Sequence, residues 1–285
     1  MITVAAEIGM AHNGDASKVA AYATAAKACG VDVLKLQCHL PEESSELEPW
    51  RVPPASGETR LQYWTRTAWD VATWRQVGQA IHAAGLQFGC SVFCLEAVAL
   101  LQQVPELDVW KIPSGAAEWV ELVDAIEMDP RPAWASGGMS TGSVYADWYR
   151  EKYLTPMNCT SLYPCPSPLS GLGWARDMYR ARLAWGWSDH TGDPALIYAA
   201  IGAGATVVEV HFEPDGWAGT TPDSSASWNM ARLTDLVQGI RRIEQGLAST
   251  DKDAIAAATA HLRKFYVPTR LNGRIAKHGG QGEPI

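Results

Sequence analysis

Short apolar runs alternate with longer helical patterns along the chain. The first run, Thr3–Ile8, is followed by an alanine-rich helical pattern over Ser17–Cys29 that ends at Gly30, a common helix stop. The next apolar run, Val31–Gln37, completes a strand–helix–strand unit. Six further apolar runs follow: Leu86–Ser91, Leu107–Ile112, Ala133–Ser136, Thr155–Ser161, Leu183–Ser188 and Thr206–His211. Four further helical patterns accompany them: Leu95–Gln103, Trp119–Ile126, Pro194–Gly202 and Trp228–Leu247.

A polar residue stands at or just after the end of each of the eight apolar runs. These residues are Glu7, Gln37, Ser91, Ser114, Ser136, Ser161, Asp189 and His211. Six of the seven intervals between them are 22 to 30 residues long, which is the length of one β/α unit. Eight such units close a barrel. An open doubly wound sheet is the alternative, but its glycine-rich phosphate loop is missing after the first strand. The sequence therefore predicts an α/β protein with a (β/α)8 TIM barrel.

The remaining interval, of 54 residues, contains an insertion after the second strand, at 38–60. Its core, Pro41–Gly57, is acidic and proline-rich, and it follows a strand on the face where such barrels carry their active sites. A lid and a solvated acidic loop are both compatible with this composition. We expect a single barrel domain over 1–264, including a short C-terminal helix, and a basic, glycine-rich tail over 265–285.

Composition excludes several classes of protein. Hydrophobic residues make up 47% and charged residues 19% of the chain, which excludes a disordered protein. The net charge of −8 argues against a nucleic-acid partner. Because no signal peptide or membrane-length apolar run is present, we expect a cytoplasmic protein that does not enter a membrane. The six cysteines form no C-x-x-C pair, and we expect free thiols in a reducing compartment.

Two lysines lie inside apolar strands, and serines end several of the others. Lys35 and Lys111 stand in Leu-Lys-Leu-Gln and Trp-Lys-Ile segments, and lysine is rarely buried without a partner. The serines are Ser91, Ser114, Ser136, Ser161 and Ser188. Such a ring suits a small, multiply charged anion, for example a phosphate ester that also carries a carboxylate. The alternative is that both lysines only pair with Glu7, Asp189 or Glu209.

A second group of residues suits a metal ion. It consists of Glu7, Asp189, His190, Glu209 and His211. The two histidines follow or end neighbouring strands, so we expect them to meet at the barrel mouth. Two imidazoles with water and carboxylate oxygens suit Mn²⁺ or a similar ion, whereas zinc more usually has a third nitrogen or sulfur ligand.

Several segments, in order along the chain, resemble motifs of the N-acetylneuraminate (sialic acid) synthase family. The segments are Ala6–Gly14, Leu34–Gln37, Trp110–Gly115, Ser136–Met139, Ser161–Pro164, Gly186–Thr191 and Glu209–Phe212, and Thr221-Pro222-Asp223 resembles the family's Pro-Asp. The Ser-Asp-His-Thr segment and the Lys-Ile-x-Ser-Gly segment at these intervals are highly specific for the family.

The resemblance implies a transferase that forms a carbon–carbon bond. Members condense phosphoenolpyruvate with the open-chain aldehyde of an N-acetylated sugar, giving a nonulosonic acid (a 2-keto-3-deoxy sugar acid) and phosphate. By resemblance, His190 and His211 hold a divalent metal, Mn²⁺ with Mg²⁺ or Co²⁺ as alternatives. The residues expected to be catalytic are Glu7, Lys35, Lys111 and Asp189. Those expected to bind substrate are Gln37, Ser91, Ser114, Ser136, Ser161, Tyr163, Ser188 and Asp223, of which Gln37 and Asp223 would face the acceptor.

Three departures from the family pattern concern the acceptor. Ala11 stands where the family has Asn, Ala116 stands where it carries an acidic or polar group, and we expect the C-terminal antifreeze-like domain to be absent. These changes favour a different acceptor, and N-acetylmannosamine, a modified hexosamine and another aldehyde all stay open. Two other hypotheses stay open: a non-catalytic barrel that serves as a scaffold, and a metal-dependent aldolase or lyase acting on a sugar phosphate. A homodimer is a further expectation.

Overall fold

The computed structural model describes most of the chain. The described residues are 1–43, 58–139, 154–175, 184–216 and 222–248, with short backbone stretches at 257, 269–271, 274–276 and 283–284. They fall into two compact units, Met1–Arg242 and Ile243–Ile285. Residues 44–57, the core of the predicted insertion, and the predicted domain boundary at 264 lie outside the described residues.

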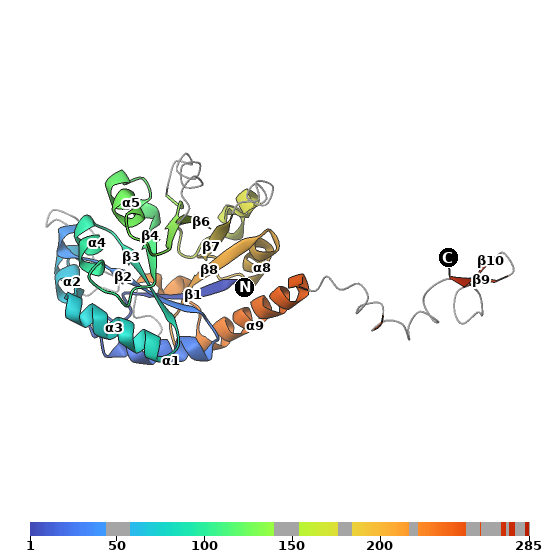
Figure 1. Ribbon diagram of the computed structural model, residues 1–285, viewed down its shortest axis with the longest axis horizontal. Helices are drawn as coiled ribbons and strands as arrows, with labels where there is room; N and C mark the ends of the chain where they lie inside the picture. Colours follow the sequence, from blue (N-terminus) through green and yellow to red (C-terminus); the bar gives the residue numbers. More distant parts are fainter. Residues whose placement is uncertain are drawn as a thin grey trace. The chain divides into compact units, whose positions relative to one another are not determined.

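The first unit is a closed barrel of eight parallel strands. The strands are β1 (Thr3–Gly9), β2 (Val33–Cys38), β3 (Gln87–Val92), β4 (Val109–Ile112), β5 (Ala133–Ser136), β6 (Leu154–Cys159), β7 (Trp185–Asp189) and β8 (Ala205–His211). They follow one another in sequence order, and β8 pairs with β1 to close the ring (Figure 1). The predicted (β/α)8 barrel is confirmed, and each strand ends within two residues of its predicted end.

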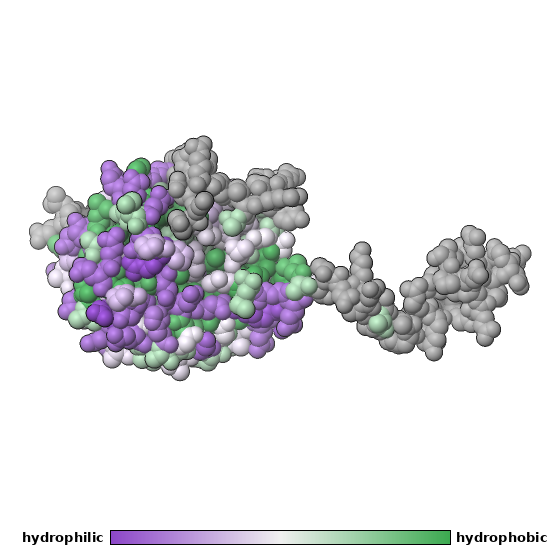
Figure 2. All heavy atoms as spheres, in the orientation of Figure 1, coloured by the Kyte–Doolittle hydropathy of each residue, from purple (hydrophilic) through white to green (hydrophobic). Residues whose placement is uncertain are grey.

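Helices cover the outside of the barrel (Figure 1). They are α1 (Lys18–Ala28), α2 (Arg60–Thr67), α3 (Val71–Ala83), α4 (Leu95–Leu101), α5 (Val120–Glu127), α8 (Pro194–Gly202) and α9 (Met230–Ala248), with 3₁₀ turns η1 (Pro41–Glu43), η2 (Ser114–Ala116), η3 (Ser167–Leu169) and η4 (Pro222–Ala226). Figure 2 shows that hydrophilic residues cover much of the outer surface over α3. Within the described residues, no helix combines the length and apolar character needed to cross a membrane.

Two helices, α2 and α3, are absent from the helical patterns read in the sequence. Helix α2 starts with a capping box, in which Thr59 and Gln62 exchange side-chain and backbone hydrogen bonds of 2.9 and 3.2 Å. Helix α3 starts at Asp70, whose carboxylate accepts from the Thr73 amide at 2.8 Å. Both caps consist of residue types that mark a helix start in a sequence, so each helix has a local signal at its first turn.

The second unit contains a small antiparallel sheet. Its strands are β9 (Thr269–Leu271), β10 (Arg274–Ala276) and β11 (Glu283–Pro284), in the order β10-β9-β11. This sheet lies in the segment predicted as a basic tail.

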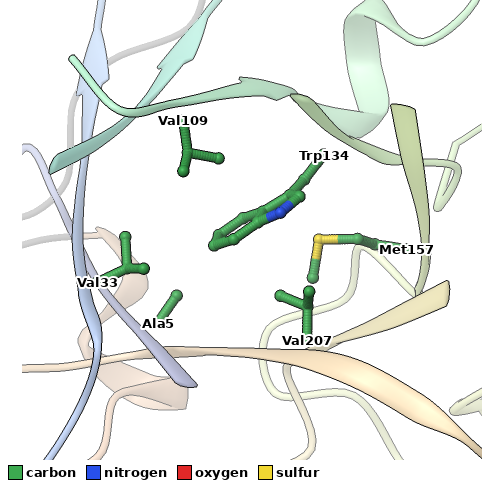
Figure 3. Close-up of a cluster of buried hydrophobic side chains, with 6 residues drawn as sticks. All are labelled: Ala5, Val33, Val109, Trp134, Met157 and Val207. Carbon is green, nitrogen blue, oxygen red and sulfur yellow. The ribbon is translucent and has the colours of Figure 1, made fainter. Parts of the chain in front are cut away.

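One inward-facing layer of apolar side chains fills the lower part of the barrel. It consists of Ala5, Val33, Val109, Trp134, Met157 and Val207, all buried (Figure 3). The remaining strands, β3 and β7, carry Gly89 and Gly186 in this layer, and an added Cβ at Gly186 would lie 3.1 Å from atoms of Met157 and Val207. At Gly89 the added Cβ would lie 3.2 Å from atoms of Lys35 and Val33, so both glycines let neighbouring side chains pack closely. The ring of Trp134 lies near the centre of the layer (Figure 3).

All six cysteines lie within the described residues. They are buried free thiols, as the sequence predicts.

Truncating the large side chain of the inner layer should destabilise the barrel. Trp134→Ala removes an indole that is only 5% exposed, and we expect a loss of about 3–5 kcal/mol in the free energy of unfolding. The measurement is denaturant unfolding followed by circular dichroism. Trp119→Ala, at a tryptophan that is 39% exposed, is the matched control and should cost less than about 1 kcal/mol. Equal losses in both variants would contradict the assignment of this layer as the core.

Candidate active site

A polar cavity of about 260 Å³ opens above the apolar layer, at the carboxyl ends of the strands. Its floor takes one residue from each strand, two positions after that strand's residue in the apolar layer. The floor residues are Glu7, Lys35, Ser91, Lys111, Ser136, Cys159, Ser188 and Glu209. Because side chains of a strand point the same way at every second position, the apolar layer itself fixes which residues face the cavity.

On one side of the floor, Lys35 is held by two neighbouring strands. The register of β1 and β2 places Glu7 beside Lys35, and the two side chains form an ion pair. Lys35 Nζ also donates to Ser91 Oγ at 2.6 Å. Glu7 Oε1 in turn accepts from the amide of Gly9 at 2.5 Å, at the point where the register of β1 shifts. The three side chains are 2% exposed or less.

On the opposite side, Lys111 reaches across the barrel to Glu209. Lys111 Nζ donates to Glu209 Oε2 at 3.0 Å, and Ser188 Oγ donates to Glu209 Oε1 at the same distance. Lys35 Nζ lies 3.9 Å from Glu209 Oε2, so Glu209 connects the two lysines. Burial alone would raise the pKa of Glu209, but Lys111 and Lys35 outweigh burial and lower it to about 2. Glu209 is therefore a carboxylate at neutral pH.

The pairing of the lysines, kept open by the sequence, is thus present in the structure. Lys35 pairs with Glu7, and Glu209 accepts from Lys111, while both ammonium groups also line the cavity. The two lysine ammonium groups and the two glutamate carboxylates carry equal and opposite charge. The cavity floor therefore offers fixed donors without a large net positive charge of its own.

Two histidines and a tyrosine form a second wall. The rings of His190 and His211 lie 5.4 Å apart, and the Tyr163 ring lies 4.1 Å from His190. His190 Nδ1 donates to the Thr160 carbonyl at 2.8 Å, which leaves Nε2 as the nitrogen that can bind a ligand in the cavity. This is the orientation that metal-binding histidines usually have, with the other ring nitrogen bonded to a carbonyl.

The donor set fits a divalent metal only in part. Two imidazoles at the cavity wall supply two ligands, and Glu209 is already bonded to Lys111 and Ser188. Among the described residues, no group of three or more His, Cys, Asp or Glu side chains is arranged around a common metal position. An ion held here would complete its coordination with water or substrate oxygens.

Serine hydroxyls line a third wall, around Cys159. Ser114 Oγ accepts from the Gly138 amide at 3.2 Å and donates to Cys159 Sγ at 3.6 Å. Ser161 Oγ lies 3.9 Å from the same sulfur. Gly138 approaches both hydroxyls closely, because an added Cβ would lie 2.8 Å from Ser161 Oγ and 2.9 Å from Ser114 Oγ.

Aromatic rings form the wall of the cavity beside β2. The His39 ring is stacked between Trp64 and Phe93, at centroid distances of 4.0 and 3.8 Å. Its Nε2 lies 3.1 Å from Gln37 Oε1, and Gln37, His39 and Phe93 all line the cavity. These rings make the wall beside β2 less polar than the floor.

Twelve of the fourteen predicted site residues line this one cavity. They are Glu7, Lys35, Gln37, Ser91, Lys111, Ser114, Ser136, Ser161, Tyr163, Ser188, His190 and His211. Asp189 does not line it: its carboxylate accepts from Trp187 Nε1, Thr191 Oγ1 and the Gly192 amide at 2.8–3.1 Å. The side chain of Asp223 lies outside the described residues.

Several cavity residues were absent from the predicted set. They include His39, Phe93, Met139 and Cys159, whereas Glu209, which the sequence analysis places in the metal-suited group, does line the cavity. The signal that finds Cys159 is its position two residues after the apolar Met157 on β6. His39 continues the same alternation from Lys35 and Gln37.

Fold and site together define a (β/α)8 barrel protein with a cavity for a small polar ligand at the carboxyl ends of its strands. The chain belongs to the NeuB family, whose model matches residues 22–252. The predicted family resemblance is thereby confirmed.

The chain is also similar to characterised relatives and solved structures. It is 26% identical over 266 residues to the N,N'-diacetyllegionaminic acid synthase of Campylobacter jejuni, covering 88% of this chain and 79% of the relative. It is 26% identical over 280 residues to human N-acetylneuraminate-9-phosphate synthase, covering 92% and 76%. A sialic acid synthetase from Leptospira borgpetersenii, crystallised with citrate, superposes with a TM-score of 0.75 at 19% identity, covering 92% of this chain and 91% of that one.

Neutralising Glu209 should change the acid sensitivity of folding. Its folded pKa lies near 2, below the unfolded value of about 4.3, so its contribution is present above pH 4.3 and lost as the pH falls towards 2. We expect the difference in free energy of unfolding between wild type and Glu209→Gln to shrink from pH 5 to pH 2.5, measured by urea unfolding. Glu96→Gln, on α4, is the matched surface control. A difference that stays constant or grows on acidification would contradict the lowered pKa.

Proposed function

We propose that this protein is a phosphoenolpyruvate-dependent synthase that joins phosphoenolpyruvate to a sugar aldehyde. The product would be a 2-keto-3-deoxy sugar acid, released with inorganic phosphate. The observation that carries the proposal is one cavity in which two buried lysines, a set of serine hydroxyls and two imidazoles converge. Family membership and the synthases among the relatives point in the same direction.

The donor half of the substrate fits the lysine and serine side of the cavity. Phosphoenolpyruvate carries a phosphate and a carboxylate, and the donors available are Lys35, Lys111 and the hydroxyls of Ser91, Ser114, Ser136 and Ser161. Because Glu7 and Glu209 already offset the lysine charges, the lysines act as fixed hydrogen-bond donors more than as a general positive field.

The acceptor half would lie towards His190 and His211. A divalent metal held by these two histidines, Mn²⁺ by the family resemblance, would supply positive charge that polarises the aldehyde carbonyl. Tyr163, beside both rings, would limit where the sugar can lie. Gln37 and His39 line the cavity beside β2, where the rest of the acceptor would extend. Asp223 stays a predicted acceptor-binding residue.

The reaction balances with water as the third reactant. Carbon 3 of phosphoenolpyruvate forms a bond to the aldehyde carbon, and the aldehyde oxygen takes up a proton. Water adds at carbon 2 and loses its proton, after which the bond from carbon 2 to the phosphate oxygen breaks and a keto group forms. The Glu7–Lys35 pair is our candidate for accepting the proton that the added water loses, because both groups are buried and line the cavity.

The acceptor is proposed to differ from N-acetylmannosamine. Ala116, which follows the cavity residues Ser114 and Gly115, is buried and offers no polar group there. The role of Asp189 is proposed to be positioning, since two of its three hydrogen bonds, from Thr191 and Gly192, hold the loop that carries His190. The homodimer and the cytoplasmic location stay predictions.

The test is phosphate release from phosphoenolpyruvate in the presence of Mn²⁺ and a panel of sugar aldehydes. We expect release to depend on both the metal and an aldehyde. Lys35→Ala and His211→Ala should each lower the rate by about 100-fold or more, since each removes a group that contacts reacting charge. Lys27→Ala, an exposed lysine on α1, is the matched control.

Product analysis separates the alternatives. Full activity in Lys35→Ala and His211→Ala would overturn the site assignment. Cleavage of a sugar phosphate without phosphate release would indicate a lyase. Failure to bind phosphoenolpyruvate or metal at all would favour the scaffold hypothesis.

A further inference from the structure

Cys159 occupies a central position in the cavity that neither its residue type nor the proposed reaction accounts for. It belongs to the ring of floor residues, is 8% exposed and lines the cavity. Its sulfur is in contact with three groups that the proposed function uses. Ser114 Oγ lies at 3.6 Å, His190 Nδ1 at 3.7 Å and Ser161 Oγ at 3.9 Å.

The contact with Ser114 fixes the direction of a hydroxyl. Ser114 Oγ accepts the Gly138 amide at 3.2 Å, so its own proton is the group that points to the sulfur. The backbone of Gly138 also packs against Ser161 Oγ, where an added Cβ would come within 2.8 Å. Ser114, Ser161 and Gly138 therefore form one cluster around the sulfur, which we call the serine–cysteine cluster.

The distances in this cluster suit sulfur and no smaller atom. Hydroxyl–oxygen hydrogen bonds need about 2.5–3.0 Å, whereas sulfur makes its contacts at greater separation. A serine side chain at 159 would place its oxygen further from both hydroxyls, because a C–O bond is shorter than a C–S bond. It would lose both contacts unless the wall moved inward.

His190 depends less on this sulfur than the serines do. Its Nδ1 already donates to the Thr160 carbonyl at 2.8 Å, a shorter and stronger bond than the 3.7 Å contact with Cys159. Loss of the sulfur should therefore disturb the serine pair first and leave the orientation of the imidazole largely unchanged.

We propose that Cys159 is a positioning residue: its sulfur holds the Ser114 and Ser161 hydroxyls side by side at the wall that the anionic substrate contacts, and the Ser114 proton turns from this weak acceptor to the anion when the substrate binds. The inference rests on the proposed function, because the anion it refers to is phosphoenolpyruvate. Cys159 itself forms no bond with the substrate in this account. It acts by keeping two hydroxyls, and the Gly138 backbone behind them, at a fixed separation.

The test is calorimetric titration of phosphoenolpyruvate into Mn²⁺-loaded full-length protein. The set comprises wild type, Cys159→Ser, Ser114→Ala and the double variant. Cys159→Ala is added in case the serine variant fails to fold. We expect Cys159→Ser to weaken binding about 10-fold, and to have less than about a twofold effect when Ser114 is already alanine, because a residue that acts through another loses its effect when that residue is removed.

Two further measurements separate positioning from general damage. Mn²⁺ affinity, measured in the same protein without phosphoenolpyruvate, should change by less than about twofold in Cys159→Ser. Cys165→Ser, at a buried cysteine in the loop that follows β6 and outside the cavity lining, is the matched control and should bind phosphoenolpyruvate like wild type.

The outcomes are distinct. Unchanged binding in Cys159→Ser and Cys159→Ala, or equal losses with and without the Ser114 hydroxyl, would overturn the positioning role while leaving the proposed function intact. Absence of binding in the wild type would overturn the proposed function itself, and this inference with it.

Discussion

The buried charge network across the barrel is the constraint on which the site depends. Lys35 and Lys111 lie where water is excluded, and an unpaired ammonium group there would cost several kcal/mol. Glu7 and Glu209 remove most of that cost: the register of β1 and β2 brings Glu7 to Lys35, and Lys111 reaches Glu209 across the barrel. Removing any one of the four leaves a buried charge without its partner. The ammonium groups are consequently held in fixed positions before any ligand arrives, which reduces the reorganisation that binding would require.

The spacing of residues along each strand determines which residues line the cavity. Each strand contributes one residue to the apolar layer and, two positions later, one to the floor. The apolar layer supplies hydrophobic stabilisation, and Gly89 and Gly186 let the side chains beside them pack closely. Several floor residues can be polar because other floor residues satisfy them. Ser91 accepts from Lys35, and Ser188 donates to Glu209. Along each strand, the residue that packs in the apolar layer and the residue that faces the cavity are therefore two positions apart.

Most of the barrel and much of the site could be predicted from the sequence, because apolar runs with polar ends mark both. Asp189 shows where this reasoning fails. It ends β7, but Ser188 and His190 face the cavity, so the residue between them must face away. Cys159 and His39 were missed for a different reason: cysteine in an apolar run reads as core, and the stacking of His39 on Trp64 and Phe93 joins segments far apart in sequence. Helices α2 and α3 were missed although a cap begins each of them and α3 repeats the buried positions Trp74, Val77 and Ile81 at helical spacing.

The central claim is that one cavity holds both charged ends of phosphoenolpyruvate. Its most direct test compares three ligands by calorimetry in Mn²⁺-loaded protein: phosphoenolpyruvate, inorganic phosphate and pyruvate. The account predicts that phosphoenolpyruvate binds at least about 10-fold more tightly than either of the others, and that Lys111→Met abolishes this advantage. Phosphoenolpyruvate binding that is no tighter than phosphate binding, and indifferent to Lys111→Met, would contradict it.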